Sequence, residues 1–228
     1  MSDSTKGGRL VRYLFVVAHP DDEVLGAGAF INRLLKDESN EVDVIILNAD
    51  YEKTRREMFE DIEKSHDVLG IKKRCLFSFK NMDFINEKQR DMVEAIEAEI
   101  KEFKPDYVFT HFDGDVHNDH RVTNAVTKQA ARLWQRHASD ERIKGLYEFE
   151  VLSSTNWNDK CFKPDTYVDV SEEDLDAKVR SLEMYQNVVR PMPHPRSKES
   201  VNALAILRGS EIGCNYAEAF KTVWRYEV

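Results

Sequence analysis

Apolar runs and amphipathic segments alternate along most of the chain. Four runs have the length and apolar content of buried strands: 13–17, 41–47, 75–79 and 106–111. Three segments between them carry apolar residues at helical spacing: 24–36, 54–69 and 87–103. Gly70 follows the second of these helices as a stop signal, and Lys104-Pro105 follows the third. This alternation predicts strand–helix–strand units and therefore a mostly parallel sheet.

The second half of the chain continues in the same way. Two further helical patterns and two strand-like segments follow: 122–134, 171–187, 146–152 and 166–170. Ser171 and Asp174 resemble a capping box at the start of the last helix. Neither an internal repeat nor a low-complexity linker divides the sequence. We therefore expect a Rossmann-like α/β fold, a three-layer α/β/α sandwich in a single domain over residues 10–228, after a flexible tail at residues 1–9.

Composition and charge exclude several classes of protein. The chain has 228 residues, 41% of them hydrophobic, and lacks an apolar run long enough for a transmembrane helix. A net charge of -9 disfavours a nucleic-acid-binding surface, which is usually basic. Residues 1–8 lack the apolar core of a signal peptide, and the three cysteines form neither a metal-binding pair nor a disulfide framework. These features lead us to expect a cytoplasmic protein without membrane insertion.

Titratable residues crowd the end of the first predicted strand. The segment 18–23, Ala-His-Pro-Asp-Asp-Glu, directly follows the run 13–17. Proline and acids are common in the first turn of a helix, so capping alone could explain the carboxylates. Capping does not explain His19, and ligands of α/β proteins bind at the carboxyl ends of strands. This segment is therefore a candidate metal site.

A second polar segment occupies the equivalent position after the fourth predicted strand. Residues 115–120, Asp-Val-His-Asn-Asp-His, follow the run 106–111 and precede a helical pattern. If the two strands are parallel and close together, both segments lie at one edge of the sheet and their side chains can converge. The remaining histidines are expected to be ordinary core or surface residues: His66, His111, His137 and His194.

Glycines near the first polar segment raise a nucleotide-binding alternative. The tripeptide 26–28, Gly-Ala-Gly, follows a strand, but Ile31 stands where the third glycine of a dinucleotide-binding loop would be. Carboxylates just before these glycines would also repel a pyrophosphate. We expect the small residues to allow close packing of this helix on the sheet.

The two polar segments together resemble the signature of a known enzyme family. Residues 19–23, His-Pro-Asp-Asp-Glu, and 117–120, His-Asn-Asp-His, are similar to the paired motifs of the LmbE-like, or PIG-L, zinc-dependent N-deacetylases. Further similarity lies at four places: Asp115, 68–71, 208–209 and 216–220. The resemblance spans about residues 12–221 and implies removal of an acetyl group from an amino sugar or a related glycoside.

The residue types fit a zinc ion that keeps one position open. Two neutral imidazoles and one carboxylate are the ligands typical of catalytic zinc. His19 and Asp22 are separated by three positions across a strand end and a helix start, so both can reach one ion. Spacing alone leaves open whether His117 or His120 is the third ligand. The resemblance implies His19, Asp22 and His120 as ligands of one zinc ion per chain.

The resemblance also implies roles in proton transfer. Asp21 would be the general base, which must lie within hydrogen-bond reach of the attacking water. His117 would be the charged partner of the oxyanion or the acid that protonates the leaving amine. Asp119 would orient His117, because carboxylates near metal sites commonly fix an imidazole's tautomer. Zinc itself lowers the pKa of its water to about 7 and polarises the acetyl carbonyl.

The substrate is expected to be a small N-acylated sugar or glycoside, and the family suggests a possible homo-oligomer. By resemblance, Arg55 or Arg56 would contact it, although a solvated pair with Glu57 or Glu60 explains these arginines equally well. Two alternative functions stay open. A metal-dependent phosphoesterase would bind two metals instead of one. An inactive sugar-binding protein of the same fold would lack a ligand or the base, all of which are present here.

Overall fold

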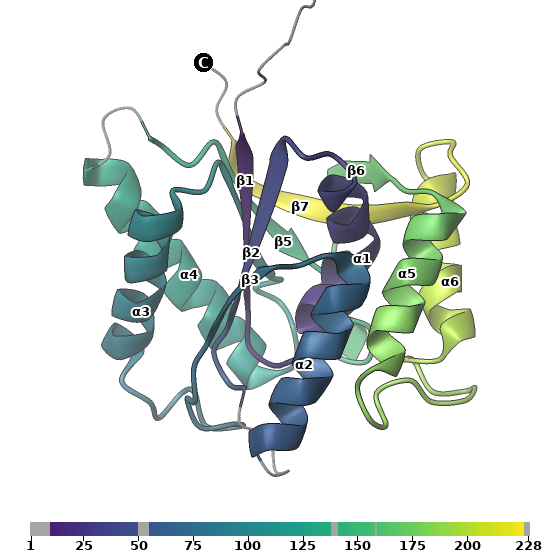
Figure 1. Ribbon diagram of the computed structural model, residues 1–228, viewed down its shortest axis with the longest axis horizontal. Helices are drawn as coiled ribbons and strands as arrows, with labels where there is room; N and C mark the ends of the chain where they lie inside the picture. The colour runs from purple at the N-terminus through teal and green to yellow at the C-terminus, as the bar shows by residue number, and fades with distance from the viewer. Residues whose placement is uncertain (1–9, 50–54, 138–140, 158, 226–228) are drawn as a thin grey trace, which may run out of the picture.

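One mixed sheet forms the centre of the computed structural model, which describes residues 10–49, 55–137, 141–157 and 159–225 (Figure 1). Its strands lie in the order β3-β2-β1-β4-β5-β7-β6. Their bounds are β1 Val11–Val17, β2 Asn40–Ile46, β3 Lys73–Leu76, β4 Tyr107–His111, β5 Gly145–Phe149, β6 Thr166–Asp169 and β7 Ala217–Arg225. All neighbouring pairs from β3 to β5 are parallel, and β7 is antiparallel to both β5 and β6.

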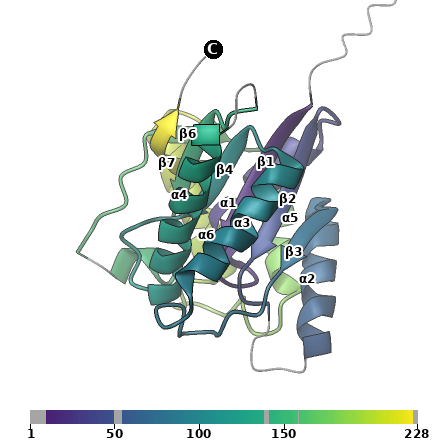
Figure 2. The same cartoon turned by 90° about the vertical axis from the view of Figure 1, so that its left-hand side faces the viewer.

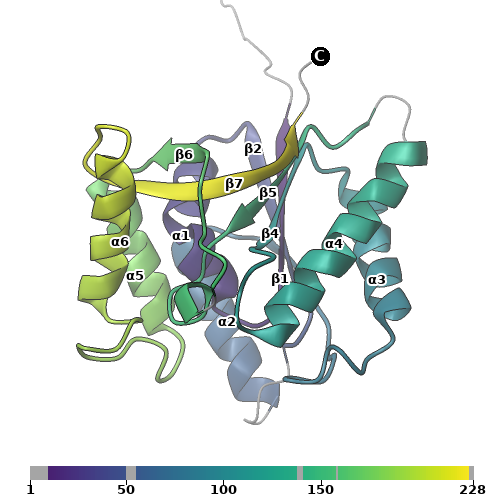
Figure 3. The same cartoon turned by 180° about the vertical axis from the view of Figure 1, so that it is seen from behind.

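Helices cover both faces of the sheet. Their bounds are α1 Asp22–Leu35, α2 Arg55–Leu69, α3 Gln89–Phe103, α4 Asn118–His137, α5 Glu172–Glu183 and α6 Lys198–Ser210. Helices α3 and α4 lie on one face, while α1, α2, α5 and α6 lie on the other (Figures 1, 2 and 3). Each face has its own cluster of buried apolar side chains. The predicted three-layer α/β/α fold with a mostly parallel sheet is confirmed.

Strand β1 lies directly beside β4, and this pairing positions the site. Phe15 pairs in register with Phe109, which pairs in turn with Tyr147 on β5. The rings of Phe15 and Phe109 stack at 4.8 Å between centroids, and those of Phe109 and Tyr147 at 5.1 Å. Because side chains alternate between faces, a slip of one residue would move this aromatic row to the opposite face of the sheet. The fixed register keeps the carboxyl ends of β1 and β4 level with each other.

Helix α1 approaches the sheet closely at its first glycine. A methyl group on Gly26 would overlap the Phe149 ring of β5, so only glycine fits there. One residue later, Ala27 leaves helical geometry, and the Glu218 carboxylate accepts hydrogen bonds from the backbone of Ala29 and Phe30. The small residues at 26–28 therefore serve packing, as predicted.

Two elements near the C-terminus were not predicted from the sequence. Strand β7 begins within the family-like segment 216–220, and its burial falls from buried residues at its start to half-buried residues at 221–224. Helix α6 exposes Ile206 and Leu207 and buries Val201, so its apolar residues are not confined to one face. Without a clear helical periodicity, the pattern gives little signal.

Two expectations concern other regions of the chain. None of the helices in the described ranges is both long enough and apolar enough to cross a bilayer. The predicted tail at residues 1–9 lies outside the described residues.

Candidate metal centre

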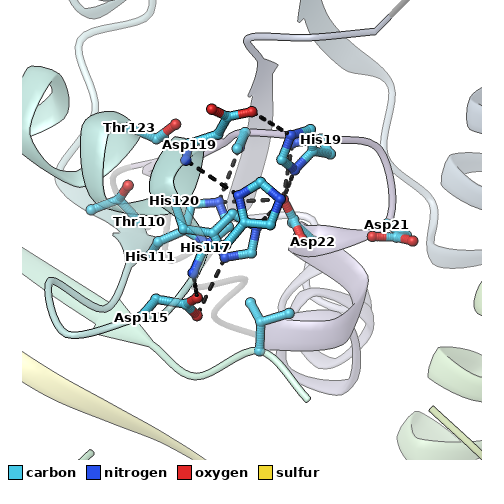
Figure 4. A network of polar contacts seen from close by, with 12 residues as sticks. His19, Asp21, Asp22, Thr110, His111, Asp115, His117, Asp119, His120 and Thr123 are labelled. Carbon is cyan, nitrogen blue, oxygen red and sulfur yellow. Dashed lines mark hydrogen bonds and ion pairs between the residues drawn. The ribbon is translucent and has the colours of Figure 1, made fainter. Parts of the chain in front are cut away.

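The two polar segments meet at the carboxyl edge of the sheet. His19 follows β1 and Asp22 begins α1, while His120 lies in the first turn of α4 after β4. Figure 4 shows their side chains pointing toward one another from these separate elements. All three are almost completely buried, with exposed fractions of 8%, 1% and 2%. The convergence predicted from the two segments is therefore present.

The carboxylate of Asp22 lies at the centre of this cluster. Its Oδ2 atom is 3.3 Å from Nδ1 of His19 and 3.3 Å from Nε2 of His120. A tetrahedral zinc ion with bonds of about 2.0 Å separates neighbouring ligand atoms by about 3.3 Å. These two separations therefore suit a shared zinc ion. Burial raises the pKa of Asp22, but nearby His120 and His111 outweigh it and hold the pKa well below its usual range.

Two sets of three side chains each offer ligand atoms within 4.8 Å of one another among the described residues. One set is His19, His117 and His120, and the other is Asp22, His111 and His120. The predicted ligands His19, Asp22 and His120 combine members of both sets. His120 belongs to both, so it is the imidazole common to every arrangement. The chemistry of these nitrogen and carboxylate donors fits zinc.

His111 is a member of the cluster that sequence reasoning placed outside it. The imidazole is fully buried, stacks on His120 at 3.9 Å between ring centroids, and accepts a hydrogen bond from the backbone of Ala18 at Nε2. Burial, and to a smaller extent the nearby His120, lowers the pKa of His111 well below its usual value. One signal was available, since His111 is the last residue of a strand whose carboxyl end faces the site.

Asp119 contacts a different imidazole from the one expected. Its Oδ2 lies 3.1 Å from Nε2 of His19, and its carboxylate also accepts hydrogen bonds from the backbone of Met82 and Phe84. A carboxylate bound to one imidazole nitrogen leaves the other nitrogen to face a metal. Asp119 thus directs Nδ1 of His19 toward Asp22. Its contact with His117 runs through the backbone, where Asp119 N donates to Nδ1 of that imidazole at 3.2 Å.

His117 is half-buried beside two other imidazoles. Its ring centroid lies 4.5 Å from that of His120 and 4.8 Å from that of His19. Burial, and then the proximity of these two rings, lowers the pKa of His117 to about 4. The imidazole is therefore neutral at pH 7. It must first accept a proton before it can protonate a leaving group or act as a charged partner.

Asp115 supports His120 from the side opposite Asp22. Its Oδ2 lies 3.3 Å from Nδ1 of His120 and accepts hydrogen bonds from the hydroxyls of Ser154 and Thr155. Burial raises the pKa of Asp115, but His120 outweighs it and lowers the pKa to about 2. Conversely, burial lowers the pKa of His120, yet Asp22 and Asp115 raise it to about 10. Two carboxylates thus fix the ring of His120.

Replacing Asp115 with asparagine should weaken zinc binding by about 10- to 100-fold, the usual effect of losing a carboxylate that orients a metal-binding imidazole. Asparagine keeps the shape and removes the charge that faces His120. Competition with a chromophoric chelator would measure the zinc affinity. Asp113→Asn is the matched control, because Asp113 is 41% exposed in the same loop and contacts Lys221. Equal affinities for the two variants would contradict the supporting role of Asp115.

Asp21 lies beside the cluster and is hydrogen-bonded to an arginine that is far away in the sequence. In Figure 4 its carboxylate is turned to one side of the imidazoles. Nη1 of Arg196 donates a hydrogen bond to Oδ2 of Asp21 at 2.9 Å. Burial raises the pKa of Asp21 to about 7, although Arg196 opposes the shift. A carboxyl with such a pKa can both accept and release a proton near neutral pH.

The structure places several arginines of the chain in different surroundings, including one of the two proposed for substrate binding. Arg55 begins α2 at the same edge of the sheet, and its side chain lies outside the described part of the chain. Arg56 is 88% exposed and pairs with Glu60 one turn later, as the alternative interpretation predicts. Arg208 pairs with Glu150 and Glu211. Arg196, which sequence reasoning did not select, is the arginine that reaches Asp21.

Comparisons with known proteins agree with this architecture. The conserved protein TT1542 from Thermus thermophilus superimposes with a TM-score of 0.77 at 22% identity, covering 94% of this chain and 96% of that one. GalB, the 4-carboxy-2-hydroxymuconate hydratase from Pseudomonas putida, gives 0.77 at 19% identity, covering 96% and 98%. The N,N'-diacetylchitobiose deacetylase from Pyrococcus horikoshii gives 0.68 at 20% identity, covering 93% and 83%. A comparison with curated proteins gave no match.

The fold and the site define an α/β protein with histidines and carboxylates gathered at the carboxyl edge of its sheet. The sequence of residues 14–131, which contains both polar segments, matches the PIG-L family, described as GlcNAc-PI de-N-acetylase. The chain belongs to this family, and the predicted resemblance is confirmed.

Proposed function

We propose that the protein is a zinc-dependent hydrolase that removes an acetyl or other short acyl group from the nitrogen of an amino sugar or glycoside. The observation that carries this proposal is the position of Asp22, whose Oδ2 lies 3.3 Å from one imidazole of each polar segment. His19, Asp22 and His120 would hold a single zinc ion. One deacetylase among the structural neighbours acts on a diacetylated sugar, by its name, and supports the same class of substrate.

Zinc, when bound, supplies a water of lowered pKa, about 7, and polarises the carbonyl of the amide. Asp21 would accept a proton from the attacking water while the water oxygen forms a bond to the acyl carbon. The C–N bond then breaks, and the departing nitrogen takes up one proton. Asp21 can return that proton, and His117 can deliver it only after accepting one, because its pKa lies near 4. The products are acetic acid and an amine, which exchange one proton at neutral pH to give acetate and an ammonium group.

The number of metals separates this proposal from a phosphoesterase. A two-metal site needs ligands for two ions about 3.5–4 Å apart. Both compact sets of ligands in the described residues include His120, so they overlap instead of forming two complete sites. We therefore favour one zinc ion per chain, and elemental analysis of the purified protein measures this number directly.

A panel of N-acetylated sugars and glycosides tests the proposed function. The zinc-loaded protein should release acetate from at least one member, and removal of zinc by a chelator should abolish the release. Phosphate monoesters and diesters form the second arm. The third arm is 4-carboxy-2-hydroxymuconate, because GalB has the same fold. Turnover only in the second or third arm would contradict N-deacetylation.

A further inference from the structure

Arg196 joins two loops that are far apart in the sequence. Its Nη1 donates a hydrogen bond to Oδ2 of Asp21 at 2.9 Å, and its Nε donates one to the hydroxyl of Ser153 at 2.9 Å. The side chain of Arg196 is 25% exposed and that of Asp21 is 9% exposed. A guanidinium presents its donors in a rigid planar fork, so two simultaneous bonds restrict its orientation. The fork is thus held in place where it meets the carboxylate.

The backbone around Arg196 is also fixed. Its N–H donates to Nδ1 of His194, and its carbonyl accepts from the N–H of Arg190. The next residue, Ser197, is the N-cap of α6, and its hydroxyl accepts from the backbone of Ser200 at 3.1 Å. The proline-rich loop at 190–196 therefore ends on a helix that anchors the arginine.

Both partners of Arg196 adopt backbone conformations that favour glycine. Asp21 has a φ of 89° and Ser153 a φ of 81°. A side chain in this region costs free energy, and residues held there are frequent at functional sites. Glycine would fit both positions without that cost, but it could bond neither nitrogen of Arg196. At both positions a side chain that bonds the guanidinium therefore stands where the backbone conformation favours glycine.

We propose that Arg196 is a positioning residue that orients the carboxylate of Asp21 for proton transfer. By binding Oδ2, it leaves Oδ1, which has no hydrogen-bond partner among the described residues, as the oxygen that accepts the proton. Ser153 in turn fixes the orientation of Arg196. This inference rests on the proposed deacetylase function and adds a residue that acts through Asp21.

Kinetics of position 196 variants test the proposal. Arg196→Gln should lower kcat by about 10- to 100-fold, since small misplacements of a reacting group have effects of this size, and should leave KM and zinc content within about twofold. Arg196→Lys should stay impaired because an ammonium keeps the charge but lacks the fork. Guanidinium added to Arg196→Ala should restore part of kcat. Arg190→Gln is the matched control, an exposed arginine in the same loop whose Nε bonds the carbonyl of Asn187, and it should behave as the wild type.

Further variants distinguish positioning from other roles. Ser153→Gly removes the hydroxyl, relieves the backbone, and should lower kcat less than Arg196→Gln does. Arg196→Gln combined with Asp21→Asn should be no slower than Asp21→Asn alone, because effects that pass through one residue are not additive. A raised KM with unchanged kcat, full activity of Arg196→Lys, or additive effects in the double variant would overturn the proposal.

A structural measurement separates failure of this proposal from failure of the proposed function. If the wild type releases acetate from no substrate, the proposed function fails, and crystal structures of zinc-loaded wild type and Arg196→Gln still test the contact. The Asp21 carboxylate should rotate in the variant while His19 and Asp22 keep their positions. An unchanged Asp21 side chain would show that Arg196 does not orient it. Melting temperatures within a few degrees of wild type would exclude a general loss of folding.

Discussion

Replacement of His19 by glutamine should reduce zinc affinity by more than about 100-fold, whereas the same replacement at His111 should leave zinc binding nearly intact. His19 presents Nδ1 to Asp22 because its Nε2 is held by Asp119. In His111 the nitrogen that faces Asp22 is already occupied, since Nε2 lies 3.4 Å from Oδ2 of Asp22 and accepts the Ala18 N–H at 3.0 Å. A glutamine amide can replace that acceptor, so His111→Gln keeps the backbone contact and removes only the imidazole.

Zinc content after dialysis and competition with a chelator measure both variants. The pair is informative because each histidine belongs to a different compact set of ligand atoms, and His120 is common to both. Retention of zinc by His19→Gln together with loss by His111→Gln would assign the metal to Asp22, His111 and His120. Loss in both variants with normal melting curves would indicate that His111 also supports the ligands. The first result would overturn the proposed set of ligands, and the second would overturn the expectation that His111→Gln leaves zinc binding nearly intact.

The meeting of the two polar segments could be predicted because it depends on local pattern and topology. Apolar runs of the right length precede both segments, and alternation of strands with helices implies a parallel sheet. In such a sheet the carboxyl ends of neighbouring strands share one edge. The pairing of β1 with β4 then brings His19 and His120 together, although about a hundred residues separate them.

The partner of each side chain could not be predicted in the same way. The family resemblance implied that Asp119 orients His117, two positions away, but the carboxylate reaches across to His19. His111 lies outside both motifs and was expected to be an ordinary core or surface histidine, yet it occupies the last position of a strand that ends at the site. The contact of Arg196 with Asp21 joins residues 175 positions apart and depends on a loop whose path has no periodic signal. Side-chain direction in three dimensions decides all of these contacts.

Replacement of Asp21 by asparagine should lower kcat by about 100-fold or more while zinc content stays at the wild-type level. Asp21 directly precedes Asp22, one of the proposed ligands, and is not itself in either compact set of ligand atoms. An asparagine oxygen can still accept the hydrogen bond from Arg196, so the local structure should persist. The asparagine amide cannot, however, take up a proton from water at neutral pH.

Acetate release at saturating substrate, with zinc measured on the same samples, checks this result. Asp113→Asn again serves as the control for loss of a carboxylate near the site. Activity within about threefold of the wild type would remove Asp21 from proton transfer and leave His117 as the remaining candidate base, since its imidazole is neutral at pH 7. Loss of zinc in Asp21→Asn would instead indicate that this carboxylate stabilises the metal, and Arg196 would then act on metal binding. The proposed assignment requires full zinc occupancy and slow turnover in the same preparation, because a general base moves the proton without holding the ion.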